Sequence, residues 1–143
     1  MVEANYSFKN IQDLVVSKTG CNEEDVTLDC DIVDDLGCVG DDLDELLSEY
    51  SSRFNVQMDS YLWYFHSEDE AHLGNIGRHF FKPPYERVLH IPVTPRMLLQ
   101  SAKEGKWLVA YPEHTLPKRR YDVFISWGIG LVVILFSFFT CSS

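Results

Sequence analysis

The sequence predicts a mainly α-helical protein: a small helical bundle with an inserted aromatic segment, followed by one C-terminal transmembrane helix. Three observations predict this class. Apolar residues recur at helical spacing in two segments of the N-terminal half. Thr94 and Pro95 form a strong helix start, because Thr caps a helix and Pro is tolerated at its first position. The run from Val123 to Cys141 is nineteen residues long and contains no charge and no proline.

The first helix is expected to begin after Ser7 and to end near Gly20. The Ser7 hydroxyl is a good cap for the N–H groups of a first helical turn. Four apolar residues then follow at helical spacing: Phe8, Ile11, Leu14 and Val15. Residues 21–40 are predicted to form an acidic loop, in which three apolar side chains turn inward: Leu28, Ile32 and Leu36.

The second helix is predicted to begin at Asp41 or Asp42, where a carboxylate can accept backbone N–H bonds and meet the positive end of the helix dipole. Its apolar residues form one stripe: Leu43, Leu46, Leu47, Tyr50 and Phe54. Asp44, Glu45 and Glu49 lie off this stripe. A charged face of this kind is usually a solvated helix surface. The functional alternative is a docking face for a protein partner, formed by Asp41, Asp42, Asp44, Glu45 and Glu49.

The segment from Gln57 to His90 is aromatic, and Leu62 to Phe65 is predicted to be a buried helix or strand, between which periodicity does not decide. Its potential metal ligands are His66, Glu68, Asp69, Glu70, His72 and His79. The spacing of these residues matches no standard metal motif, so no metal site is predicted. An enzyme that uses the region from His66 to His79 remains an alternative, and it would bind a metal stoichiometrically.

The chain after this segment is predicted to turn and then to enter a third helix. Lys82 to Tyr85 contains two prolines and is expected to turn, and Arg87 to Val93 is expected to be a short extended segment. The helix that begins at Thr94 is expected to stop at Gly105.

The C-terminal run predicts a membrane anchor. Nineteen residues at about 1.5 Å each span roughly 28 Å, which is close to the thickness of the hydrocarbon core. Lys118, Arg119 and Arg120 precede the run, so the positive-inside rule places the N-terminal part in the cytoplasm. No signal peptide is expected at the N-terminus, and insertion of so late a helix is expected to be post-translational.

Charge and cysteine content exclude several classes of function. The net charge is -10, and residues 1–50 hold fourteen Asp or Glu against Lys9 and Lys18. A field of this sign repels nucleic acid and favours a basic protein partner. The four cysteines form no C-x-x-C pair, which argues against a disulfide framework and a zinc site. Cys38 is expected to be an ordinary reduced thiol, and a reactive thiol is the alternative. No catalytic motif can be assembled from the chain, so an enzyme is not expected.

Residues 26–54 resemble the centre of an acyl carrier protein. In that family V-T-x-x-x-x-x-x-x-D-L-G-x-D-S-L precedes an acidic helix, and this chain matches it without a gap at Val26, Thr27, Asp35, Leu36, Gly37, Asp42 and Phe54. Residues 91–107 resemble the last helix of the family. The G-D-D variant of the loop and the later G-K-W also resemble a small enterobacterial family of uncharacterised carrier-like proteins.

The resemblance implies a carrier fold without the cofactor. The serine that carries phosphopantetheine in the family falls on Gly40, which has no hydroxyl, and neither Asp41 nor Asp42 can replace it. We therefore expect no cofactor. The expected domains are residues 1–107, with an insert at about 57–92, then a linker at 108–120 and an anchor at 121–143.

The function expected from these observations is protein interaction without catalysis, by a carrier-like domain held at the bacterial inner membrane. The acidic second helix would contact a basic partner. A small inner-membrane subunit or regulator that acts through its transmembrane helix is the alternative, and exchange of that helix for an unrelated one would then abolish function.

Overall fold

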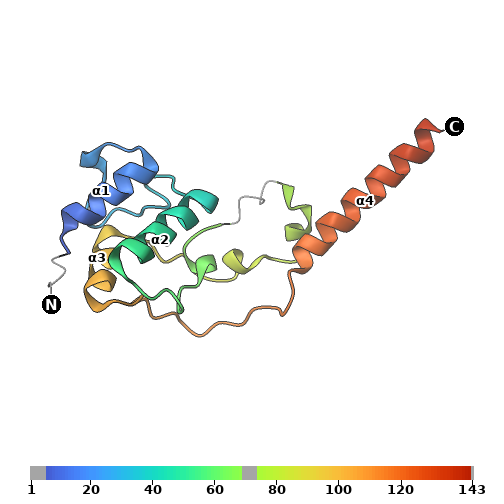
Figure 1. Ribbon diagram of the computed structural model, residues 1–143. Helices are drawn as coiled ribbons and strands as arrows, with labels where there is room; N and C mark the ends of the chain where they lie inside the picture. The colour runs from blue at the N-terminus through green and yellow to red at the C-terminus, as the bar shows by residue number, and fades with distance from the viewer. Residues whose placement is uncertain (1–5, 69–73, 143) are drawn as a thin grey trace.

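The computed structural model describes residues 6–68 and 74–142. It is mainly α-helical, as the sequence predicts: α1 (Phe8–Thr19), α2 (Gly40–Phe54) and α3 (Pro95–Glu104) gather at one end, and α4 (Tyr121–Cys141) extends from the other (Figure 1). Short 3-10 turns lie between them: η1 (Glu23–Asp25), η2 (Trp63–Phe65), η4 (Ile76–His79) and η5 (Pro84–Glu86). Within the two described ranges the chain forms no β-strand, and residues 57 and 106 make an isolated parallel bridge.

Helix α1 has the limits that the sequence predicts. The backbone N–H of Ser7 donates to the Asn10 side chain at 2.9 Å, which satisfies one of the groups that the helix start would leave unpaired. Gly20 ends the helix with φ of 69°, and its N–H donates to the Val16 carbonyl. Glycine tolerates this left-handed conformation at little cost.

Helix α2 begins differently from the prediction. Val39 is the N-cap, its side chain makes no capping hydrogen bond, and Gly40 is the first helical residue. Asp41 and Asp42 therefore lie in the first turn and do not cap the helix. Their carboxylates still meet the positive end of the helix dipole, because the dipole acts over the whole first turn.

The core lies between α1, α2 and α3, and it uses the apolar stripe predicted for α2. The stripe residues are all buried, and so are the side chains they meet from the other helices: Ile11, Leu14, Val15, Leu98 and Ala102. From the loop before α2, Ile32 is fully buried while Leu28 and Leu36 are half-buried. The Tyr50 hydroxyl donates to the Leu98 carbonyl at 2.6 Å, so the one polar atom of this buried side chain is satisfied.

Helix α3 follows the predicted signals. The Thr94 Oγ1 atom accepts the Met97 N–H at 3.2 Å, Pro95 occupies the first helical position, and Gly105 ends the helix with φ of 70°. The isolated bridge to residue 57 then ties this end of α3 to the end of α2.

The insert is less regular than predicted. Of the residues from Leu62 to Phe65, the last three form the 3-10 turn η2, and Phe65 alone is buried. Residues 87–93, predicted to be an extended segment, form no β-strand, and the Ile91 N–H donates to the Phe65 carbonyl. The proline-rich turn is present as η5.

Helix α4 is 21 residues long with a mean hydropathy of 2.3 over its most apolar window, none of which is buried. By its length and composition, this helix could cross a membrane. Before it, residues 108–118 have no regular structure.

Candidate functional site

The start of α2 combines a glycine with a backbone conformation that suits glycine. Gly40 has φ of 55°. An L-residue in this left-handed region is strained by about 1–2 kcal/mol. Glycine has no hydroxyl to carry a phosphopantetheine arm. The backbone conformation at Gly40 also disfavours its replacement by serine.

The five carboxylates predicted to form a docking face all lie on α2, away from its buried stripe. Four of them are exposed and Glu49 is half-buried: Asp41, Asp42, Asp44, Glu45 and Glu49. We call this set the acidic face. The structure therefore brings the predicted residues together on one helix, and their role in binding remains a prediction.

Lys18 of α1 offsets part of the charge on the acidic face. Its Nζ atom lies 2.8 Å from Glu45 Oε1 and 2.7 Å from Glu49 Oε2. The hydrogen bond from Lys18 holds the pKa of the Glu45 carboxyl below its usual range. Both carboxylates are substantially exposed, so these ion pairs add little to folding stability. Their main effect is to leave the negative charge of the face concentrated toward the first turn, where Asp41 and Asp42 lie.

A groove of about 450 Å³ adjoins that first turn. The lining comes from α2 on one side and the aromatic insert on the other: Gly40, Asp41, Leu43, Asp44, Tyr61, Trp63, Ser67 and Glu68. The Tyr61 hydroxyl is buried and has no hydrogen-bond partner among the described residues, and burial raises its pKa. The groove thus joins aromatic rings to carboxylates, a combination that suits a cationic side chain.

His66, which the sequence offered as a potential metal ligand, is a core residue of the insert. It is fully buried, its ring stacks on Tyr61 with centroids 5.3 Å apart, and it lies perpendicular to the Trp107 ring at 5.5 Å. Its Nδ1 atom lies 2.7 Å from the Ile91 carbonyl oxygen, and its Nε2 atom lies 2.8 Å from the Tyr111 hydroxyl. Both ring nitrogens are therefore occupied within the protein.

The hydrogen bonds around Tyr111 fix the tautomer of His66. The Tyr111 oxygen accepts N–H bonds from Trp107 Nε1 at 2.8 Å and from the Leu62 backbone at 3.1 Å. With both lone pairs used, its own proton points to His66 Nε2, so the proton of the imidazole lies on Nδ1 and faces the Ile91 carbonyl. Burial lowers the pKa of His66 to about 4, so the ring is neutral at pH 7.

Among the described residues, the potential ligands Glu68 and His79 form no metal-binding group with His66. Glu68 and His79 are exposed, and Asp69, Glu70 and His72 lie outside the described residues. Because both nitrogens of His66 are already bonded, metal ligation there would break the tie to Ile91 or to Tyr111.

A different group of possible metal ligands comes together at the surface: Asp31, Asp34 and His90. His90 Nε2 lies 2.6 Å from Asp31 Oδ2 and 3.6 Å from Asp34 Oδ2. The other Asp31 oxygen accepts the Val33 N–H at 2.9 Å. These contacts tie the acidic loop to the segment before α3, which accounts for the group without an ion. Sequence reasoning missed it because the residues lie 59 positions apart and follow no local motif.

Cys38, near the predicted carrier loop, is a buried thiol. Burial raises its pKa to about 11, so the thiolate is scarcely populated at neutral pH. This agrees with the expectation of an ordinary reduced cysteine.

Comparison with known proteins places most of the chain in one family. A family model described as "Protein of unknown function (DUF1493)" matches residues 8–110. No curated protein and no solved structure matches the chain. The matched residues include α1, α2, α3 and the whole insert, and end before α4.

Proposed function

The chain belongs to the DUF1493 family of proteins of unknown function, and we propose that it is a membrane-anchored, non-catalytic protein-interaction module resembling an acyl carrier protein. Residues 1–107 form the carrier-like domain, with residues 57–92 as its insert. Residues 108–120 link the domain to the anchor at 121–143. The partner is a protein with a basic surface.

The acidic face of α2 is the observation that carries this proposal. The helix buries one complete apolar stripe and presents five carboxylates on its other side, beginning at a glycine with positive φ. Lys18 offsets part of this negative charge, at Glu45 and Glu49, and leaves Asp41, Asp42 and Asp44 beside the groove. The adjoining groove adds aromatic surface, which a Lys or Arg side chain of the partner can enter.

Anchoring rests on α4. Lys118, Arg119 and Arg120 precede this helix, and a cluster of cations next to a transmembrane helix favours the cytoplasmic side. The carrier-like domain is accordingly placed in the cytoplasm, at the inner membrane of a bacterium. Attachment to the membrane keeps the whole domain within one molecular length of the bilayer, so membrane-associated basic proteins are the partners that it meets most often.

The test is crosslinking and affinity purification of the full chain from membranes, with two matched variants. The first removes three charges beside the groove: Asp41→Asn, Asp42→Asn and Asp44→Asn. The second removes three charges elsewhere: Glu24→Gln, Asp25→Asn and Glu104→Gln, all of them exposed. Glu45 and Glu49 are left in place because their loss would leave Lys18 without its partners.

We expect the first variant to lose a crosslinked partner that the wild type and the second variant both retain. Equal capture by all three proteins would show that the acidic face is a solvated surface. A further arm replaces α4 with an unrelated transmembrane helix. If this exchange abolishes capture while the first variant does not, recognition lies in the membrane and the proposal for α2 is wrong.

A further inference from the structure

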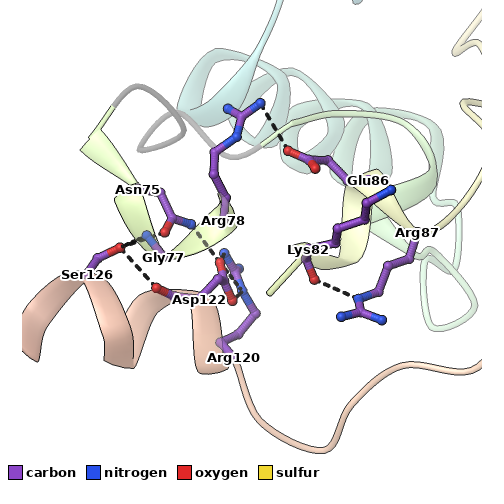
Figure 2. A network of polar contacts seen from close by, with 9 residues as sticks. All are labelled: Asn75, Gly77, Arg78, Lys82, Glu86, Arg87, Arg120, Asp122 and Ser126. Carbon is purple, nitrogen blue, oxygen red and sulfur yellow. Dashed lines mark hydrogen bonds and ion pairs between the residues drawn. The ribbon is translucent and has the colours of Figure 1, made fainter. Parts of the chain in front are cut away.

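The base of α4 is fixed to the insert by a network of polar contacts (Figure 2). The Gly77 N–H donates to Ser126 Oγ at 2.8 Å, and Ser126 Oγ donates to Asn75 Oδ1 at 2.7 Å. The Asn75 amide donates to Asp122 Oδ2 at 2.6 Å, and Arg120 pairs with the same carboxylate. Asp122 is 2% exposed, so η4 covers the side of α4 on which Asp122 lies.

The packing of η4 on α4 is close. A Cβ atom added to Gly77 would overlap the carbonyl oxygen of Asp122. The backbones of the two segments therefore meet without a side chain between them, and the position of η4 along α4 is determined. The rings of Phe81 and Tyr121 also pack together, with centroids 5.6 Å apart.

The length of α4 decides where η4 lies relative to a bilayer. Its 21 residues span about 31 Å, which matches a hydrocarbon core of roughly 30 Å. The part of α4 beyond its hydrogen bond to Gly77, from Trp127 to Cys141, spans only about 22 Å. If η4 stayed in the aqueous phase, the bilayer would have to become thinner by about 8 Å, and each ångström of mismatch carries a free-energy cost.

The side chains of η4 and the residues after it suit the membrane interface. Ile76 is 52% exposed, Phe80 68% and Phe81 46%, on a segment next to the start of α4. Exposed apolar residues of this size, rimmed by polar groups, mark contact surfaces, and aromatic rings are enriched at the level of the lipid headgroups.

The charges near this segment have the sign that attracts anionic lipid. Residues 74–90 hold Arg78, Lys82 and Arg87 against one acidic residue, and residues 118–122 hold three further cations against Asp122. Figure 2 shows Lys82 and Arg87 side by side, with Arg87 Nε donating to the Lys82 carbonyl at 2.6 Å. The acidic face of α2, by contrast, belongs to the opposite end of the molecule (Figure 1).

We propose that residues 76–82 form a membrane-facing loop, which inserts Ile76, Phe80 and Phe81 into the interfacial layer of an anionic bilayer. The occupant of this surface is phospholipid, with Lys82 and Arg87 at the headgroups. The loop and α4 together hold the domain in a fixed orientation, with α1, α2 and α3 away from the bilayer. This inference rests on the proposed function in one respect, namely that α4 is embedded.

The test is photo-crosslinking of the full chain in nanodiscs of phosphatidylethanolamine and phosphatidylglycerol. A benzoylphenylalanine replaces Phe80 in one protein. It replaces Trp127, which is 77% exposed on α4, in a second, and Leu108, which is 41% exposed just beyond α3, in a third. Lipid adducts are then measured by mass spectrometry.

We expect the adduct yield at position 80 to lie within about twofold of that at 127, and the yield at 108 to be about tenfold lower. Replacement of phosphatidylglycerol by phosphatidylcholine should lower the yield at 80 by about twofold or more and leave that at 127 unchanged. An adduct at 127 without one at 80 would overturn the membrane-facing loop and leave the anchor intact. A crosslink from 80 to protein instead of lipid would also overturn it. Absence of adducts at both 80 and 127 would overturn the anchor, and with it both proposals.

Discussion

The neutral, buried His66 makes the stability of the insert sensitive to mild acid. An unfolded chain binds a proton at this histidine near pH 6.5, whereas the folded protein resists it until about pH 4. The pKa is lowered on folding, so the stabilisation is complete above pH 6.5 and is lost as the pH falls toward 4. Protonation would also set an Nε2–H against the hydroxyl proton of Tyr111.

The magnitude follows from the shift in pKa. Each pH unit below 6.5 costs about 1.4 kcal/mol, so the free energy of unfolding should fall by about 2 kcal/mol between pH 7.5 and pH 5.0. The carboxyls of Asp29 and Glu45 also stabilise the folded protein, because Arg96 and Lys18 lower their pKa values. Their stabilisation is lost only as the pH falls below their unfolded values near 4, outside the chosen interval.

The perturbation is His66→Gln, which keeps one donor and one acceptor but does not titrate. The variant should lose about 1–2 kcal/mol at pH 7.5, because the amide packs less well than the ring against Tyr61 and Trp107. Its further loss between pH 7.5 and 5.0 should be smaller than that of the wild type by about 2 kcal/mol. Urea unfolding of the full chain in micelles, followed by tryptophan fluorescence, measures the free energy of unfolding at the two pH values for each protein. An equal pH dependence in the two proteins would refute the assignment of the neutral histidine.

Three further predictions concern single positions. Gly77→Ala should displace η4 from α4, because its Cβ overlaps the Asp122 carbonyl, whereas Gly74→Ala should not, because nothing lies within 4 Å; hydrogen exchange of the η4 amides checks both. Gly40→Ser should gain no phosphopantetheine mass from a transferase and coenzyme A, like the wild type, and should lose about 1–2 kcal/mol of stability from its positive φ. Tyr111→Phe should cost about 2–4 kcal/mol in thermal unfolding, because it leaves two N–H donors and one acceptor without their partner. A modified Gly40→Ser protein would contradict the second of these, and an unchanged melting temperature the third.

Local patterns predicted the helices and their limits well, because caps, glycine stops and apolar spacing act within a few residues. Gly20, Thr94 and Gly105 are examples, and so is the buried stripe of α2. The start of α2 at Gly40 was missed, because a carboxylate can stabilise a helix from its first turn as well as from its cap.

The surroundings of the insert could not be predicted, because they depend on contacts between distant parts of the chain. His66 is satisfied by residues 25 and 45 positions away. Gly77 donates to Ser126, 49 positions away. No local sequence pattern could therefore predict that η4 packs on the first turns of α4. The pairing of Lys18 with Glu45 likewise joins α1 to α2 across 27 positions.

Recruitment of a basic partner by the acidic face of α2 can be measured as the association rate of the partner captured from membranes. The rate is measured for the wild type, for the triple Asn variant at Asp41, Asp42 and Asp44, and for the matched variant with three charges removed elsewhere. We expect the wild-type rate to fall steeply with salt, the triple Asn variant to associate about tenfold more slowly, and the matched variant to associate at nearly the wild-type rate. A rate that is the same in all three proteins and insensitive to salt would contradict it.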